Sequence, residues 1–122
     1  MSANILTVDD SASIRMTTKI ALTNAGYQVT EAVDGADGLS KAKSASYDMI
    51  VTDLNMPNMN GLEMIEALRQ SPAHTGIPII FLTTESDADM KARAKAAGAT
   101  GWVTKPFDPE NLVKIVRKVL GK

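Results

Sequence analysis

The 122-residue chain carries 13 Lys and Arg against 14 Asp and Glu, and its formal net charge is −1. This near-neutral balance provides no overall field that would recruit nucleic acid or an anionic membrane. The absence of cysteine excludes disulfides, thiolate metal sites and thiol nucleophiles. The longest apolar run, 77–82, is far too short to span a bilayer, so we expect a cytoplasmic protein of one domain.

In the first half of the chain, two short strands alternate with two helices. The first strand is expected at 4–8 and is followed by Asp9-Asp10 and by a helix that Ser11 or Ser13 can cap. Apolar residues with helical spacing predict the inner face of this helix: Ile14, Ala21, Leu22 and Ala25. Gly26 suits the left-handed position at its end. A more polar strand at 28–32 is typical of a sheet edge, and a helix is expected at 36–45.

The stretch 47–61 is the most informative part of the sequence. An apolar, β-branched run at 49–52 has the character of a buried parallel strand and ends on Asp53. A loop composition rich in Asn, Pro and Met follows. Further periodic stretches predict helices at 61–70, 88–97 and 109–120 and strands at 77–83 and 101–104. Asp108 is the expected cap of the last helix, with Pro109 at its first position.

Strand and helix alternate five times, a pattern that predicts an α/β fold. We expect a doubly wound, five-stranded parallel sheet with right-handed crossovers and helices on both faces. No linker, repeat or low-complexity segment divides the chain. We therefore interpret 1–122 as a single domain without an effector domain.

Polar side chains follow four of the expected strands at the point where each apolar run ends. They are Asp9 with Asp10, then Asp53, Thr83 and Lys105. Singly, an Asp after a strand is more often a turn former or helix cap. The carboxyl ends of parallel strands, however, share one edge of the sheet, so these side chains are expected to converge there.

Three converging carboxylates repel one another unless a cation is present. Oxygen ligands without nearby His or Cys favour Mg²⁺ or Mn²⁺ over zinc. Lys105 adds a positive charge on the other side of the pocket. A pocket of this kind suits a phosphoryl group, with Thr83 as hydroxyl donor and Asp53 as in-line nucleophile that forms an aspartyl phosphate.

These motifs, over the whole chain, resemble the receiver domain of two-component response regulators, in particular the stand-alone chemotaxis (CheY-like) type. The residues that carry the resemblance are Asp9-Asp10, Asp53 with Met56-Pro57 and Gly61, Thr83-Thr84, and Lys105-Pro106-Phe107. The resemblance implies a flavodoxin-like sheet of order 2-1-3-4-5. It also implies a signalling domain that phosphorylates and dephosphorylates itself rather than an enzyme.

The resemblance also implies a role for each matching residue. Asp53 corresponds to the phosphoacceptor, and Thr83 and Lys105 to the residues that contact the phosphoryl group. The implied metal ligands are Asp9, Asp10, Asp53 and the backbone carbonyl of Asn55. The residues that flank the phosphoryl group are Asn55, Thr84 and Glu85. Trp102 occupies the position of the aromatic switch, where Tyr, Phe or His is more usual.

The resemblance implies two kinds of protein partner for a monomeric domain. A histidine kinase would supply the phosphoryl group, and a downstream protein, such as a flagellar motor switch component, would bind the activated form. The face expected to bind it is formed by 88–97, 101–104 and 109–120. Its candidate residues are Lys91, Lys95, Trp102, Ile115 and Lys118.

Several alternatives remain beside this interpretation. The domain could be a phosphorelay intermediate or a phosphate sink, and the basic face could be an ordinary solvated surface. Trp102 could simply be a packing residue. A dehalogenase-like phosphotransferase would want a second acid, which Asp53-Leu54-Asn55 lacks. A calcium loop is disfavoured, because Met64 stands where the bidentate Glu should be.

Overall fold

The computed structural model describes residues 3–54, 56, 58–70, 76–83, 88–105 and 107–121. Their strands and helices alternate along the chain, in the order β1 (Asn4–Val8), α1 (Ala12–Asn24), β2 (Gln28–Ala32), α2 (Gly35–Ser44), β3 (Met49–Asp53), α3 (Gly61–Arg69), β4 (Ile79–Thr83), α4 (Ala88–Ala96), β5 (Gly101–Thr104) and α5 (Pro109–Leu120). The strands form one parallel sheet of order β2-β1-β3-β4-β5. The predicted fold class and strand order are confirmed, and β2 lies at an edge.

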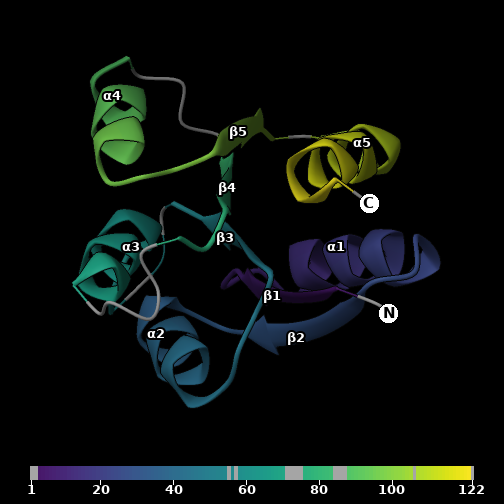
Figure 1. The fold of residues 1–122 in the computed structure, drawn as a ribbon, viewed down its shortest axis with the longest axis horizontal. Helices are drawn as coiled ribbons and strands as arrows, with labels where there is room; N and C mark the ends of the chain where they lie inside the picture. Colours follow the sequence, from purple (N-terminus) through teal and green to yellow (C-terminus); the bar gives the residue numbers. More distant parts are fainter. Residues whose placement is uncertain are drawn as a thin grey trace.

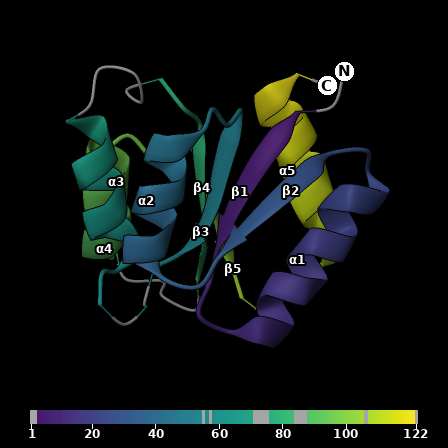
Figure 2. The ribbon, with the colours of Figure 1, turned by 90° about the horizontal axis from the view of Figure 1, so that it is seen from below.

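Helices cover both faces of the sheet. Helices α1 and α5 lie on one face, and α2, α3 and α4 lie on the other (Figures 1 and 2). None of the helices that the structure describes is long and apolar enough to cross a membrane.

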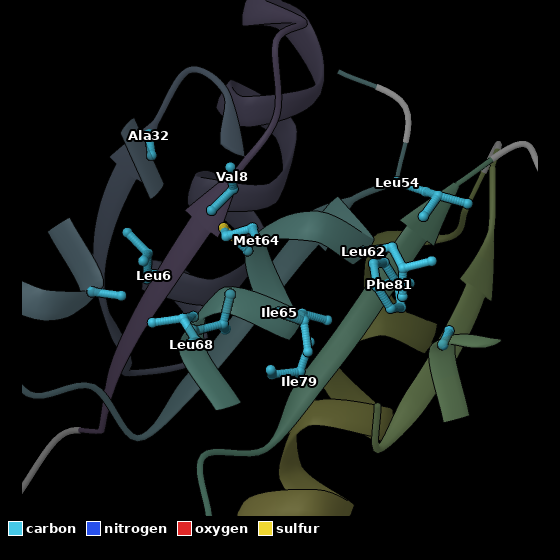
Figure 3. Close-up of a cluster of buried hydrophobic side chains, with 13 residues drawn as sticks. Leu6, Val8, Ala32, Leu54, Leu62, Met64, Ile65, Leu68, Ile79 and Phe81 are labelled. Atoms are coloured by element: carbon cyan, nitrogen blue, oxygen red, sulfur yellow. The ribbon is translucent and has the colours of Figure 1, made fainter. Parts of the chain in front are cut away.

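Two apolar clusters, one on each face, hold the helices to the sheet. Successive strand residues alternate between them, because side chains of a strand point to opposite faces: Ile50 and Phe81 belong to one cluster, Val51 and Leu82 to the other. Figure 3 shows the first cluster, in which Leu6 and Val8 of β1 meet Met64, Ile65 and Leu68 of α3. Both faces of the central strands are therefore buried, so an accessible site can lie only at the strand ends.

The predicted bounds of β1, β2, β5 and α5 are confirmed, and other element boundaries differ from the predicted ones by one or two residues. Strand β4 begins at Ile79, since Pro78 has no N–H to donate to the ladder. Helix α2 begins at Gly35, because Asp34 accepts a hydrogen bond from the N–H of Asp37 and is the N-cap. Helices α2, α3 and α4 each end one residue earlier than predicted.

Arg69 anchors the chain at the carboxyl end of helix α4. Among its described side chains only Ala94 is buried. The Arg69 guanidinium, at the end of α3, donates to the carbonyls of Ala97 and Gly98, just beyond α4, at 3.3 and 2.9 Å, and to that of Ile77 at 2.9 Å. This cation lies at the end of α4 where the helix dipole is negative, and it therefore stabilises that end.

The inner face of α1 includes Thr18, which was not among the residues predicted for it. The buried residues of this helix are Thr18 and Leu22, whereas Ile14, Ala21 and Ala25 are only half-buried. The period of 3.6 residues places position 18 directly between 14 and 22, but an inner face chosen from apolar residues passes over a threonine. The Thr18 hydroxyl is buried without a hydrogen-bond partner.

Replacing Thr18 by Val is expected to stabilise the protein. The change preserves the shape of the side chain and removes an unpaired buried hydroxyl, for a gain of roughly 1 kcal/mol. Thermal unfolding should show a melting temperature higher by a few degrees. Thr17→Val is the matched control, because the exposed Thr17 hydroxyl donates to the Ser13 carbonyl at 3.0 Å. Equal melting temperatures for wild type and Thr18→Val would contradict this account.

Candidate functional site

The carboxyl ends of β1 and β3 bring three carboxylates together. Because β1 and β3 are neighbours, with Val8 opposite Thr52, Asp9 and Asp10 follow β1 beside Asp53, the last residue of β3. One carboxylate oxygen from each of the three residues lies within 4.8 Å of the others. Asp9 and Asp53 are buried, and Asp10 is exposed. The convergence predicted from the strand ends is present.

Lys105 directly follows β5, at one edge of the sheet, and its side chain reaches this cluster. Its backbone N–H donates to the carbonyl of Thr83 at 2.8 Å, which continues the pairing of β4 with β5. Its Nζ lies 2.9 Å from Asp9 Oδ2 and 3.3 Å from Asp53 Oδ2. With only 12% of its side chain exposed, this ammonium partly neutralises the two buried carboxylates.

Asp53 sits in a rigid backbone setting. Its Oδ1 accepts a hydrogen bond from the N–H of Leu54 at 2.8 Å. Gly61, at the start of α3, packs so closely that a Cβ there would lie 2.2 Å from the Asp53 carbonyl oxygen, so only glycine fits at this position. Burial raises the pKa of the Asp53 carboxyl; Lys105 opposes this increase and the Asp9 carboxylate adds to it.

Trp102 lies on β5, beside the fully buried Phe81. Their ring centroids are 5.7 Å apart at a tilt of 53°, and Lys91 Nζ lies 5.6 Å from the indole centroid, within cation–π range. The ring is half-buried, but its Nε1 is buried without a hydrogen-bond partner. Trp102 borders a surface hollow of about 390 Å³ whose lining includes Lys91 and Lys95.

The sequence model of the response regulator receiver domain family matches residues 5–117, which is nearly the whole chain. The chain belongs to the receiver domain family.

Known proteins similar to this receiver domain include both longer regulators and single domains. It is 39% identical over 116 residues to the response regulator ArlR of Staphylococcus aureus; the match covers 95% of this chain but 52% of ArlR. The chain thus spans about half the length of such curated relatives. It also resembles the chemotaxis protein CheY4 of Vibrio cholerae, with 45% identity, a TM-score of 0.93 and coverage of 98% of this chain and 99% of that chain.

The acidic cluster of this receiver domain fits a hard divalent cation. Its donors are carboxylate oxygens, the ligands that Mg²⁺ prefers. A receiver domain of the sensor histidine kinase PA1611 of Pseudomonas aeruginosa has a magnesium ion coordinated in its active-site cleft; it is 26% identical over the full length of both chains, with a TM-score of 0.91. Asp9, Asp10 and Asp53 are the residues that would hold such an ion here.

The remaining predicted site residues fall into three groups. Thr83 ends β4 and is fully buried. Asn55, Thr84 and Glu85 lie outside the described residues. On the predicted partner face, Ile115 packs with the cluster beneath α5, whereas Trp102 packs with the opposite cluster. The structure therefore gathers Lys91, Lys95 and Trp102, with Ile115 on the other side of β5 and Lys118 exposed on α5.

Two residues beside the site had no prior role in the sequence analysis. Phe81 supports Trp102 from β4, and the Arg15 guanidinium donates to the backbone carbonyl of Asp9 at 2.6 Å. Phe81 could be found from its alternation in β4, once β4 and β5 are paired. Arg15 leaves no such signal, because a polar residue on a helix is ordinarily solvated.

Proposed function

We propose that this receiver domain is a cytoplasmic, phosphorylation-controlled switch. Asp53 accepts a phosphoryl group from a histidine kinase, and the face formed by α4, β5 and α5 then changes its affinity for a partner protein. The observation that carries this proposal is the acid cluster bridged by Lys105, at 2.9 Å from Asp9 and 3.3 Å from Asp53. The pocket combines a nucleophile, a place for a cation and a fixed positive charge.

In the proposed reaction an Asp53 carboxylate oxygen attacks the phosphorus of a phosphohistidine. The P–O bond forms as the P–N bond breaks, and the imidazole leaves with the electron pair and takes up a proton. A divalent cation held by Asp9, Asp10, Asp53 and the Asn55 carbonyl would supply charge neutralisation for the phosphoryl oxygens. Lys105 contacts those oxygens from the other side, and Thr83 donates a hydroxyl hydrogen bond to them. Water later hydrolyses the aspartyl phosphate, so the domain turns over no external substrate.

We further propose that the signalling pathway is chemotaxis and that the partner is a flagellar motor switch component. The similarity to CheY4, which extends over nearly the full length of both chains, supports this assignment. The basic hollow beside Trp102, which includes Lys91 and Lys95, is complementary to an acidic segment that carries apolar side chains.

Labelling with acetyl phosphate in the presence of Mg²⁺ tests the reaction. Mass spectrometry should detect one added phosphoryl group, and peptide mapping should place it on Asp53. Loss of the label should not be accompanied by turnover of added phosphoesters. Such turnover, or a label at another residue, would contradict the switch and favour a phosphotransferase.

Partner binding tests the proposed output. Beryllofluoride mimics the phosphoryl group, so its addition with Mg²⁺ should increase binding to a flagellar motor switch protein from the same organism. Reversal of Lys91 and Lys95 to Glu should reduce that binding and its salt sensitivity. Lys114→Glu, an exposed change on α5, is the matched control. Unchanged affinity after the double reversal would exclude this face.

Trp102 is expected to report activation. In the family, the Thr hydroxyl moves toward the phosphoryl group and the aromatic side chain follows into the space behind it. The buried, unpaired indole N–H costs roughly 1–3 kcal/mol in the present arrangement. A change of about 1.4 kcal/mol shifts a two-state ratio tenfold. Beryllofluoride with Mg²⁺ should therefore change Trp102 emission and reduce its quenching by iodide, and Mg²⁺ alone should do less.

The Lys91 charge requires a second quencher in this experiment. Because Lys91 Nζ lies 5.6 Å from the indole centroid, iodide can be attracted to the ring irrespective of its exposure. Acrylamide is neutral and reports exposure alone, and Lys91→Gln removes the attraction. If beryllofluoride binds but leaves emission and both quenching constants unchanged, Trp102 is a packing residue and the signal takes another route.

A further inference from the structure

The junction between β1 and α1 is held by a side chain outside the acid cluster. Arg15 belongs to the second turn of α1, and 17% of its side chain is exposed. Its Nη1 donates to the backbone carbonyl of Asp9 at 2.6 Å. This hydrogen bond connects the helix to the peptide that joins two of the three carboxylate residues.

Glu31 fixes the other side of the guanidinium. The Nε of Arg15 lies 3.4 Å from Glu31 Oε2, and Glu31 lies opposite Thr7 in the pairing of β1 with β2. The Glu31 carbonyl also accepts a hydrogen bond from Lys41 Nζ at 2.5 Å. Arg15 therefore links β2 to the β1–α1 junction through contacts on both sides of its guanidinium.

The three carboxylates differ in how their oxygens are held. Asp9 accepts a hydrogen bond from the Ser11 N–H and pairs with Lys105, and Asp53 accepts one from the Leu54 N–H and also pairs with Lys105. Within the described part of the chain, the Asp10 carboxylate has no hydrogen bond or ion pair. No side-chain contact holds it, so the backbone at Asp10 decides which rotamers can bring the carboxylate to the site.

Arg15 holds the backbone at Asp10 through its hydrogen bond to the Asp9 carbonyl. The Asp9 carbonyl and the Asp10 N–H belong to one planar peptide group, so fixing the oxygen also fixes the orientation of the N–H and the position of the Asp10 Cα. The Asp9 N–H donates to the Ala32 carbonyl at 3.1 Å, which fixes the preceding peptide. A hydrogen bond from a charged donor is among the stronger ones in proteins.

We propose that Arg15 is a positioning residue for the divalent cation: it orients the Asp9–Asp10 peptide so that the Asp10 carboxylate faces the site. This inference rests on the proposed function, since it concerns the cation that the phosphoryl transfer requires. It assigns to Arg15 no contact with the ion or the phosphoryl group. Partners of this kind behind metal ligands typically change metal affinity by 10- to 100-fold when removed.

A positioning role and a purely electrostatic role predict effects of opposite sign. Removing a positive charge near a cation site favours the cation by Coulomb's law. Removing the donor that orients Asp10 weakens cation binding. Titration with Mg²⁺ alone, followed by calorimetry or by the emission of Trp102, should show about tenfold weaker binding by Arg15→Gln. Lys19→Gln is the matched control, because Lys19 pairs with the same Glu31 at 3.4 Å.

Two further measurements separate positioning from loss of the fold. Melting in EDTA should show that Arg15→Gln remains folded, and acetyl phosphate labelling should require more Mg²⁺ for half-maximal yield but reach the wild-type yield at saturation. Arg15→Lys keeps the charge but not the forked geometry, so it should recover the affinity only in part. If Arg15→Gln does not fold, Arg15→Lys decides the question.

Mg²⁺ binding by the folded Arg15 variant as tight as wild type, or tighter, would overturn the positioning role. A wild-type protein that binds no Mg²⁺ would instead overturn the proposed function. The two failures are thus distinguishable in one set of titrations.

Discussion

Replacement of Asp53 by Asn is expected to abolish covalent phosphorylation and leave the fold intact. An amide oxygen is a far weaker nucleophile than a carboxylate, so labelling by acetyl phosphate should fall to background. The Leu54 N–H donates a hydrogen bond to Asp53 Oδ1 at 2.8 Å, and the amide oxygen of Asn can accept the same hydrogen bond. The side chain should therefore keep its position while its chemistry is lost.

The same substitution should stabilise the metal-free protein at neutral pH. Burial raises the pKa of Asp53 in the folded state above its value in the unfolded chain, about 3.9. A carboxyl of this kind reduces folding stability as the pH rises from the unfolded pKa through the folded one. Asn carries no such ionisation, so its gain in stability should be absent below about pH 4 and should increase as the pH rises through the folded-state pKa of Asp53. Mg²⁺ should reverse the order, because it binds the wild-type site more tightly and stabilises that fold.

Thermal unfolding at several pH values, with EDTA or with Mg²⁺, measures this effect. Glu66→Gln removes an exposed carboxyl from α3 and should leave the stability nearly unchanged at every pH. Labelling of Asp53→Asn at wild-type stoichiometry would exclude Asp53 as the phosphoacceptor. A stability difference that does not vary with pH would show that the Asp53 charge is not its cause.

The strand ends were the part of the site most predictable from sequence. An apolar run that stops at a polar residue marks both the end of a strand and its exposed edge, and Asp53 and Lys105 follow such runs. The parallel order of the strands then brings these residues together, since all carboxyl ends share one edge. The fold and the acid cluster thus depend on patterns that are local in sequence.

Contacts between side chains distant in sequence were much less predictable. The pairing of Lys105 with Asp9 joins residues 96 positions apart and depends on how far a flexible lysine reaches across β3 and β4. The Arg15 contact depends on the rotamer of a side chain whose position looks like an exposed helix surface. Composition and periodicity carry no information about either choice.

The side on which a residue packs was also only partly predictable. Thr18 is buried on the period of α1 although its residue type suggests exposure, and Ile115 faces a different cluster from Trp102 although both border the predicted partner face. A strand at the edge of a sheet separates helices on its two faces, and sequence spacing does not reveal on which side a given helix packs.

Replacement of Lys105 by Ala should destabilise the metal-free protein strongly and also disconnect phosphorylation from output. Both of its ion pairs are buried, with 12% of the Lys105, 6% of the Asp9 and 10% of the Asp53 side chain exposed. Loss of one partner leaves buried carboxylates without a counter-charge, at a cost of about 3 kcal/mol. The pKa of Asp53 should rise further, because Lys105 is the main group that opposes its increase. The loss of stability should therefore be largest at neutral pH.

Mg²⁺ should largely restore the stability of this variant. Lys105 competes with a divalent cation for the same Asp9 and Asp53 oxygens, so its removal should tighten Mg²⁺ binding, on the order of tenfold for 1.4 kcal/mol. Arg15→Gln, which also removes a cation near this pocket, is expected to weaken the same binding. The opposite signs distinguish a charge that occupies the site from one that shapes it.

With Mg²⁺ present, the coupling role of Lys105 can be measured on a folded protein. Beryllofluoride should still bind near Asp53 in Lys105→Ala, but partner affinity should no longer increase. Lys105 is the group that would join the phosphoryl oxygens to β5, since its backbone N–H donates to Thr83 and its strand carries Trp102. Lys114→Ala, an exposed change on α5, should retain the full response. If Lys105→Ala gains as much partner affinity with beryllofluoride as wild type does, the activation signal does not pass through Lys105.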